Sequence, residues 1–128
     1  MNGLFLILSL SVCGMFHSAM AQYRSEVWVS DEGNGMYRNP VLHADYSDPD
    51  VCVVGEDYFL TASSFNCTPG LPILHSKDLV NWKIVNYALK KVEPVEYYNE
   101  ARHGKGVWAP SIRFHIYTGV IRILAFLW

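Results

Sequence analysis

The sequence has no excess of one charge and no histidine spacing of the kind that binds a metal. Its 10 lysines and arginines stand against 12 acidic residues, without a block of either sign. A binding surface for nucleic acid or for an anionic membrane is therefore not expected. No two histidines have a spacing such as His-x-x-x-His, so neither a metal site nor a cofactor is predicted.

Cysteine is also scarce, with three residues in all. Cys13 lies in the N-terminal apolar run, which leaves Cys52 and Cys67 for the folded part of the chain. A hairpin turn at 55–57 would direct Cys52 toward Leu60 and leave Cys67 past the paired region. We therefore expect free or buried thiols, even though an exported protein meets an oxidising environment.

Long hydrophobic runs are limited to the N-terminus, where Leu4 to Phe16 are mostly apolar. A membrane span needs about 20 apolar residues, so this run is too short. It precedes the small-residue site Ala19-Met20-Ala21, which predicts a signal peptide over 1–21 with cleavage before Gln22. The mature chain is expected to be secreted or periplasmic and free of the membrane. A lipid anchor at Cys13 is the alternative, but the preceding residue is larger than is usual at such a site.

Aromatic residues are plentiful, with eight tyrosines, six phenylalanines and four tryptophans. Such a composition is typical of a β-rich core, and it also suits a surface on which sugar rings stack. Composition alone does not choose between the two.

The strand pattern begins after a polar, glycine-rich lead-in segment at 22–38. Four runs rich in apolar, β-branched and aromatic residues follow, at 50–54, 58–65, 71–75 and 82–87. They predict a four-stranded antiparallel meander in an all-β protein, without helical periodicity. One blade of a β-propeller has this pattern, although a sandwich or a barrel fits it as well.

Five short segments occur in an order that suggests a family. They are Asn39-Pro40-Val41-Leu42, Asp45-Tyr46-Ser47-Asp48-Pro49-Asp50, Tyr58 to Phe65, Leu74 to Trp82 and Val107-Trp108-Ala109-Pro110-Ser111. Together they resemble the N-terminal part of glycoside hydrolase family 43, in particular its β-xylosidase and α-arabinofuranosidase branch. The resemblance covers Tyr37 to His115, so we assign 39–115 to it. It implies a five-bladed β-propeller, with only the first blade and part of the second present here, and hydrolysis with inversion at the anomeric carbon.

The resemblance also implies roles for three residues. Inverting hydrolysis requires one carboxylate that deprotonates water and one carboxylic acid that protonates the leaving oxygen. Asp48 matches the general base, and Phe65 and Trp108 match aromatic walls of the sugar pocket. From the residues alone, an aspartate before proline is more often a turn cap, and buried aromatics are common in any β core. Asp45 and Asp50 are predicted to be turn and solvated carboxylates, and Trp82 is expected to staple the blade.

Residues 116–128 match no segment of that family. One alternative is a further apolar strand. The other is an out-of-frame tail, caused by a small deletion near His115, because codons regrouped by one base can encode a segment like the one expected downstream. The general acid and the carboxylate that tunes it would then lie beyond this chain. The chain is accordingly predicted to be a truncated and inactive fragment.

The function expected of the parent protein is hydrolysis of a carbohydrate substrate, with removal of xylosyl or arabinosyl units. One alternative is a fructan-cleaving enzyme, whose N-terminal carboxylate is a nucleophile in a Trp-x-x-Asp-Pro-Asn motif that Ser47-Asp48-Pro49-Asp50 fits poorly. A second alternative is a non-catalytic, carbohydrate-binding propeller that keeps the aromatic residues.

Overall fold

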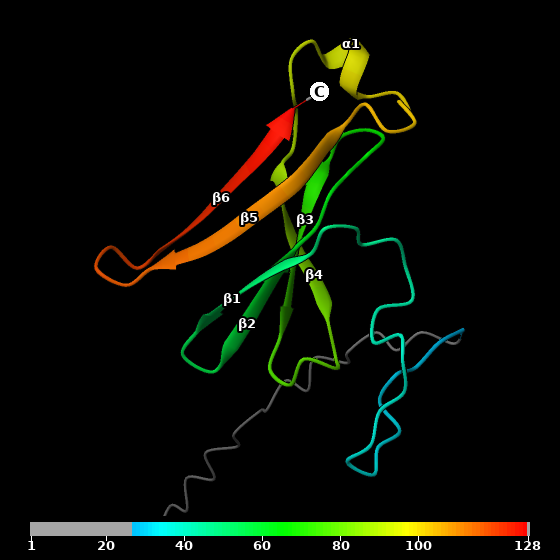
Figure 1. Cartoon of the computed structure of the whole chain (residues 1–128), viewed down its shortest axis with the longest axis vertical. Helices are drawn as coiled ribbons and strands as arrows, with labels where there is room; N and C mark the ends of the chain where they lie inside the picture. The colour runs from blue at the N-terminus through cyan, green and yellow to red at the C-terminus, as the bar shows by residue number, and fades with distance from the viewer. Residues whose placement is uncertain (1–26, 128) are drawn as a thin grey trace, which may run out of the picture.

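The computed structural model describes residues 27–127, which form strands and one short helix (Figure 1). The elements are β1 (Asp50–Val54), β2 (Asp57–Thr61), β3 (Gly70–Ser76), β4 (Lys83–Leu89), α1 (Val95–Tyr98), β5 (Val107–His115) and β6 (Val120–Leu127). The signal peptide predicted over 1–21 lies outside the described residues. Across 27–127, no helix has the length and apolar character needed to cross a membrane.

The first four strands form one antiparallel sheet in the order β1-β2-β3-β4. This confirms the predicted meander and the all-β class. β1 and β2 are joined by a tight turn after the pair Val54 and Asp57, and Gly55 in that turn has a φ of +63°. Glycine adopts this left-handed conformation without the steric cost that a side chain incurs, which explains the turn at this position.

The second strand is shorter than the prediction of 58–65, because β2 ends at Thr61. The next residues leave the sheet for other partners. The backbone N–H of Ser63 donates to the carbonyl of Ser47 at 2.9 Å. Ser64 and Val107 form an isolated antiparallel bridge with N···O distances of 2.7 and 2.9 Å. The predicted strand end at Phe65 was wrong because the alternating residue pattern continues to Phe65, whereas the backbone changes its hydrogen-bonding partners after Thr61.

The core of this sheet is small and centres on Leu60, Ala62 and Leu74, which are buried together. Leu60 and Leu74 lie directly opposite one another on β2 and β3. Three partly buried residues pack against them: Leu42, Tyr46 and Trp82. The indole N–H of Trp82 donates to the carbonyl of Leu79 at 2.9 Å, so Trp82 closes the β3–β4 turn as predicted.

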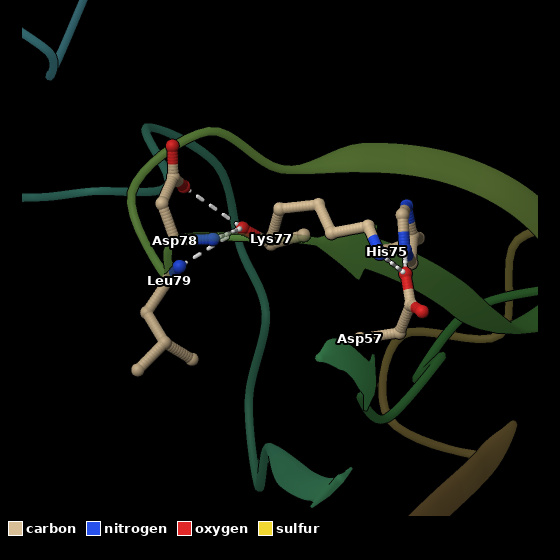
Figure 2. A network of polar contacts seen from close by, with 6 residues as sticks. Asp57, His75, Lys77, Asp78 and Leu79 are labelled. Carbon is tan, nitrogen blue, oxygen red and sulfur yellow. Dashed lines mark hydrogen bonds and ion pairs between the residues drawn. The ribbon is translucent and has the colours of Figure 1, made fainter. Parts of the chain in front are cut away.

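The β3–β4 turn is organised by the side chains of Ser76 and Asp78; Asp78 and the following Leu79 are seen in Figure 2. The Ser76 hydroxyl accepts hydrogen bonds from the backbone N–H groups of Asp78 and Leu79 at 3.1 and 2.9 Å. Asp78 accepts from Val80 and from both the backbone and the side chain of Asn81. Desolvation is the largest influence and raises the pKa of Asp78, but the hydrogen bonds outweigh it and lower the pKa to about 2. The turn is therefore held by an ionised carboxylate.

A second polar group lies on the same sheet, where Figure 2 shows Asp57 beside His75 and Lys77. The carboxylate of Asp57 is 2.5 Å from the His75 ring nitrogen and 2.8 Å from the Lys77 ammonium. The hydrogen bonds from Lys77 and His75 hold the pKa of Asp57 below its ordinary value. These side chains are partly or largely exposed, so the cluster contributes little to stability.

The described part of the lead-in segment, 27–38, is attached to the domain more firmly than its polar composition predicts. The Trp28 ring stacks on His43 with centroids 5.1 Å apart. Ser30 is buried, and its hydroxyl donates to the carbonyl of Val41 at 3.0 Å. The Asn81 side chain donates to Asp31 at 2.9 Å, which links the segment to the β3–β4 turn.

The remaining strands form a separate two-stranded sheet, β5–β6, whose turn projects away from the four-stranded sheet (Figure 1). Val107 and Ile112 of β5 are buried, whereas most of β6 is exposed. The strand at 120–127 agrees with the simpler alternative of one more apolar strand. α1 precedes this sheet and spans four residues, which is too short to produce a helical period in the sequence.

Both described cysteines are free thiols, as predicted. Cys52 is buried opposite Phe59 on β2, one position from the expected Leu60. Its burial raises the pKa of the thiol. Cys67 lies beyond β2 in the connection to β3.

Candidate active site

Asp48 lies in the segment that enters β1, and its side chain is exposed. Its backbone has a φ of +46°, in the left-handed region that non-glycine residues seldom adopt. Such a conformation costs of order 1–3 kcal/mol and persists where the surroundings enforce it, often at functional sites. The structure therefore holds Asp48 in a specific, strained position.

The side chain of Ser63 contacts the Asp48 carboxylate. The Ser63 hydroxyl donates to Oδ2 of Asp48 at 2.7 Å. The same hydroxyl oxygen accepts a hydrogen bond from the backbone N–H of Ala109 at 2.8 Å. A short chain of hydrogen bonds thus runs from β5 through Ser63 to the candidate base.

Gly106 allows the two sheets to approach one another at this point. It is buried beside the Ser64–Val107 bridge, and a Cβ built on it would lie 2.2 Å from the carbonyl oxygen of Ser64 and 2.7 Å from the carbonyl carbon of Phe65. Real Cβ atoms do not come so close to backbone atoms, so any side chain here would push the two segments apart. The close approach requires glycine.

The close approach brings together Phe65 and Trp108, the two predicted sugar-binding aromatics. Their ring centroids are 6.1 Å apart with an interplanar angle of 53°, and both side chains are partly buried. Trp108 directly precedes Ala109, whose N–H reaches Ser63. All three predicted site residues therefore meet at one junction between the two sheets.

One side of this junction is formed by the connection between α1 and β5, which the sequence did not suggest. The N–H of Gly104 donates to the carbonyl of Phe65 at 3.0 Å, and the N–H of Arg102 donates to the carbonyl of Asn66 at 3.1 Å. The N–H of Thr68 donates to the carbonyl of Tyr98 at 2.7 Å. These bonds join backbone groups 30 to 39 positions apart, and no residue pattern predicts such pairings.

Asp50 corrects a prediction, because it is more than a solvated carboxylate. Its Oδ2 accepts a hydrogen bond from the backbone N–H of Ile112 at 2.9 Å and another from the guanidinium of Arg113. Desolvation is the largest influence and raises the pKa of Asp50, but these hydrogen bonds together lower the pKa below its ordinary value. Asp50 thus ties β1 to β5 and keeps the junction closed. Asp45 is exposed and accepts only from Ser47 among the hydrogen bonds described, in line with its predicted role.

The arrangement suits proton transfer between water and a carboxylate. Asp48 is open to solvent, and the hydrogen bond from Ser63 leaves its second carboxylate oxygen, Oδ1, to face water. An ionised carboxylate can accept a proton from water when substrate lies beside it. Within 27–127, no group of three or more histidine, cysteine, aspartate or glutamate side chains could hold a metal ion.

Comparison with known proteins places this junction in an enzyme family. The model of the glycosyl hydrolases family 43 matches residues 37–118. A β-xylosidase from Formosa agariphila is 37% identical over 99 residues, and a non-reducing end α-L-arabinofuranosidase from Bacteroides ovatus is 42% identical over 81 residues. These alignments cover 75% and 62% of this chain but only 17% and 15% of the relatives.

Solved structures agree. A glycoside hydrolase family 43 protein from Bacillus licheniformis superposes with a TM-score of 0.60 at 40% identity, over 70% of this chain and 17% of that protein. The chain thus spans about one sixth of the length of the relatives that it matches.

Proposed function

The chain belongs to glycosyl hydrolase family 43, and from this we propose that Asp48 is the general base of an inverting hydrolysis of glycosidic bonds. The substrates are carbohydrates that contain xylose or arabinose, as the names of the relatives suggest. The observation that carries the proposal is the position of Asp48, which is strained, exposed to solvent and hydrogen-bonded to the junction that holds Phe65 and Trp108.

In the proposed mechanism, Asp48 deprotonates a water molecule that attacks the anomeric carbon. A carboxylic acid on the other face of the sugar protonates the leaving oxygen, about 6.5–9.5 Å away in inverting enzymes. The proposal assigns that acid to the part of the family's length that this chain does not span. Phe65 and Trp108 present aromatic faces against which the apolar face of a sugar ring packs.

We also propose that the protein is exported and cleaved between Ala21 and Gln22. The support is the apolar run followed by the small-residue site Ala19-Met20-Ala21. Mass spectrometry of the N-terminus of the secreted protein should show a chain that begins at Gln22. A product that keeps Met1, or one that begins at a lipidated Cys13, would contradict export by this route.

The role of Asp48 can be tested in a chimera in which 37–115 of this chain replace the matching stretch of the Formosa agariphila β-xylosidase. Replacing that stretch supplies the rest of the propeller and the remaining catalytic groups. Asp48→Asn preserves the size of the side chain but removes its ability to take a proton. Hydrolysis of an aryl β-xyloside should fall at least about 100-fold, since general base catalysis contributes about 10²–10⁴-fold.

Asp45→Asn is the matched control, because it makes the same chemical change at an exposed carboxylate outside the junction. We expect it to keep activity within about threefold of the parent chimera, and circular dichroism should show both variants folded. Activity of the Asp48 variant within about tenfold of the parent would remove the base role. A folded parent chimera that binds xylose but hydrolyses nothing would favour a non-catalytic, carbohydrate-binding function.

A further inference from the structure

We propose that Ser63 is a positioning residue for the general base, one that fixes the direction of the Asp48 carboxylate. This inference rests on the proposed catalytic role of Asp48. It concerns a residue of the segment after β2 whose hydroxyl contacts the Asp48 carboxylate. Ser63 acts through Asp48.

The hydrogen bonds of the Ser63 hydroxyl determine where its proton points. A serine hydroxyl has one proton to donate and two lone pairs that accept. In this structure the oxygen accepts a hydrogen bond from the N–H of Ala109 at 2.8 Å, so the hydroxyl proton cannot point in that direction. The proton is therefore directed to the other close partner, Oδ2 of Asp48 at 2.7 Å. The amide of β5 orients the serine, and the serine orients the carboxylate.

Ser63 holds Asp48 through its backbone as well. Its N–H donates to the carbonyl of Ser47, the residue just before Asp48, at 2.9 Å. One contact is made to Ser47 and the other to Asp48, whose φ is +46°. Together they oppose relaxation of the Asp48 backbone from this conformation. Ser63 is only 7% exposed, whereas Asp48 is exposed. Water has little access to a buried donor, so the donor can hold a solvated carboxylate in one rotamer.

A bulge in β5 supplies the third part of the arrangement. The pairing of β5 with β6 shifts register between Trp108 and Ser111, and Ala109 within the bulge has a φ of +51°. A bulge frees backbone groups from the ladder and re-aims them, often beside active sites. Here it turns the Ala109 N–H to Ser63. The Ser63 hydroxyl thus links β5, which carries Trp108, to the candidate base Asp48.

The neighbouring serine provides a matched comparison. The Ser64 hydroxyl accepts from the N–H of Leu71 at 2.8 Å, a bond that stabilises the entry to β3 and does not involve Asp48. Ser63→Ala and Ser64→Ala each delete one hydroxyl from adjacent positions and leave one amide N–H without its partner. Only the first deletion releases the base.

The test uses the same chimera and separates kcat from KM. In Ser63→Ala, kcat for an aryl β-xyloside should fall about 10- to 100-fold, because small errors in the placement of a catalytic group have effects of this size. KM should stay within about threefold, because the sugar pocket is intact. Ser64→Ala should leave both constants within about threefold of the parent. Ser63→Cys fills nearly the same space but donates weakly, so it should stay folded and lose kcat about tenfold.

An unchanged kcat in Ser63→Ala or in Ser63→Cys overturns the inference. So does a loss in Ser63→Ala that is matched by Ser64→Ala, or that is divided between kcat and KM, because such losses reflect general damage to the fold. If Ser63→Ala fails to fold, the result for Ser63→Cys decides. The Asp48→Asn variant distinguishes the two proposals: its inactivity beside a fully active Ser63→Ala removes only the positioning role, whereas an active Asp48→Asn removes the base itself.

Discussion

The four-stranded sheet and the β5–β6 hairpin differ in how they are stabilised. The sheet buries Leu60 and Leu74 under residues of the preceding segment and the next turn, so its core is built from neighbours along the chain. In the hairpin, β5 is buried at Val107 and Ile112, while β6 pairs with β5 alone in its sheet and is largely exposed. The comparison shows that local sequence can assemble one blade, whereas the candidate site depends on contacts between blades.

Specific contacts join the two regions. They include the Ser64–Val107 bridge, the Ala109–Ser63–Asp48 chain of hydrogen bonds and the bonds from Ile112 and Arg113 to Asp50. Each can be altered singly in the chimera. Such changes show how far the site depends on the sheet and on the junction.

The largest effect is expected within the core of the sheet. Leu74 is 1% exposed, and Leu74→Ala should lower the free energy of unfolding by about 2–5 kcal/mol, because it leaves a cavity. Urea unfolding of the chimera measures the change. Leu79→Ala is the matched control: this leucine is 45% exposed in the β3–β4 turn, and its truncation should cost under about 1 kcal/mol. Equal losses would show that the sheet has no distinct core.

The junction is the next most sensitive place. Gly106→Ala puts a methyl group where the backbone of Ser64 and Phe65 lies, so we expect a loss of about 3 kcal/mol and a marked fall in kcat as the aromatic pair separates. Thermal unfolding and turnover of the chimera measure both.

Gly55→Ala is the control for this change. Its methyl group meets open space, so only the φ of +63° opposes it, at about 1 kcal/mol, with activity retained. If Gly106→Ala behaves in the same way, the two sheets can separate without harm and the close approach is not required.

Acid should weaken the link between β1 and β5. The pKa of Asp50 is lowered in the folded protein, so its carboxylate stabilises the fold above the unfolded value of about 3.9. That stabilisation is lost as the pH falls through the lower, folded-state pKa. Asp50→Asn should lower the free energy of unfolding by about 1–2 kcal/mol at pH 6. The loss is modest because the partner Arg113 is largely exposed and the ion pair is weakened by solvent.

The measurement is the thermal midpoint of both chimeras from pH 6 down to about pH 2.5. The two curves should approach one another toward the acid end, as Asp50 takes up a proton. Curves that stay parallel over the whole range would mean that the charge of Asp50 does not hold the junction.

The smallest effect on stability is expected in β6. Leu124 and Phe126 are 76% and 72% exposed, so their replacement by lysine should change the free energy of unfolding by less than about 0.5 kcal/mol. It should instead reduce self-association of the 128-residue chain, because exposed apolar edge strands promote aggregation. Sedimentation velocity measures this. Thr118→Lys adds one such charge in the adjacent turn, without removing apolar surface, and should leave association unchanged.

The hypothesis that 116–128, which include β6, are translated out of frame can be tested separately. The family model ends at residue 118, just before β6 begins. A strand forms at 120–127 because β-branched and aromatic residues are abundant there, whatever their origin. Out-of-frame translation of 116–128 stays a prediction. The nucleotide sequence of the gene decides it: the regrouped frame must continue into a propeller-like sequence.

Much of the first blade could be read from the sequence. The four runs of apolar and β-branched residues, with Gly55 in the turn, determined the meander and its order, because alternation along a strand is a local property. The order of the five motifs also singled out Asp48, Phe65 and Trp108, and the structure brings them to one junction.

Only the tertiary structure decided what holds those residues in place. Asp50 was predicted to be solvated but ties the two sheets together, and neither Ser63 nor Gly106 carried a recognisable signal. The bonds concerned join Ala109 to a residue 46 positions away and Ile112 to one 62 positions away. Such pairings depend on how one sheet packs against another, and a residue's immediate neighbours in sequence contain no information about that packing.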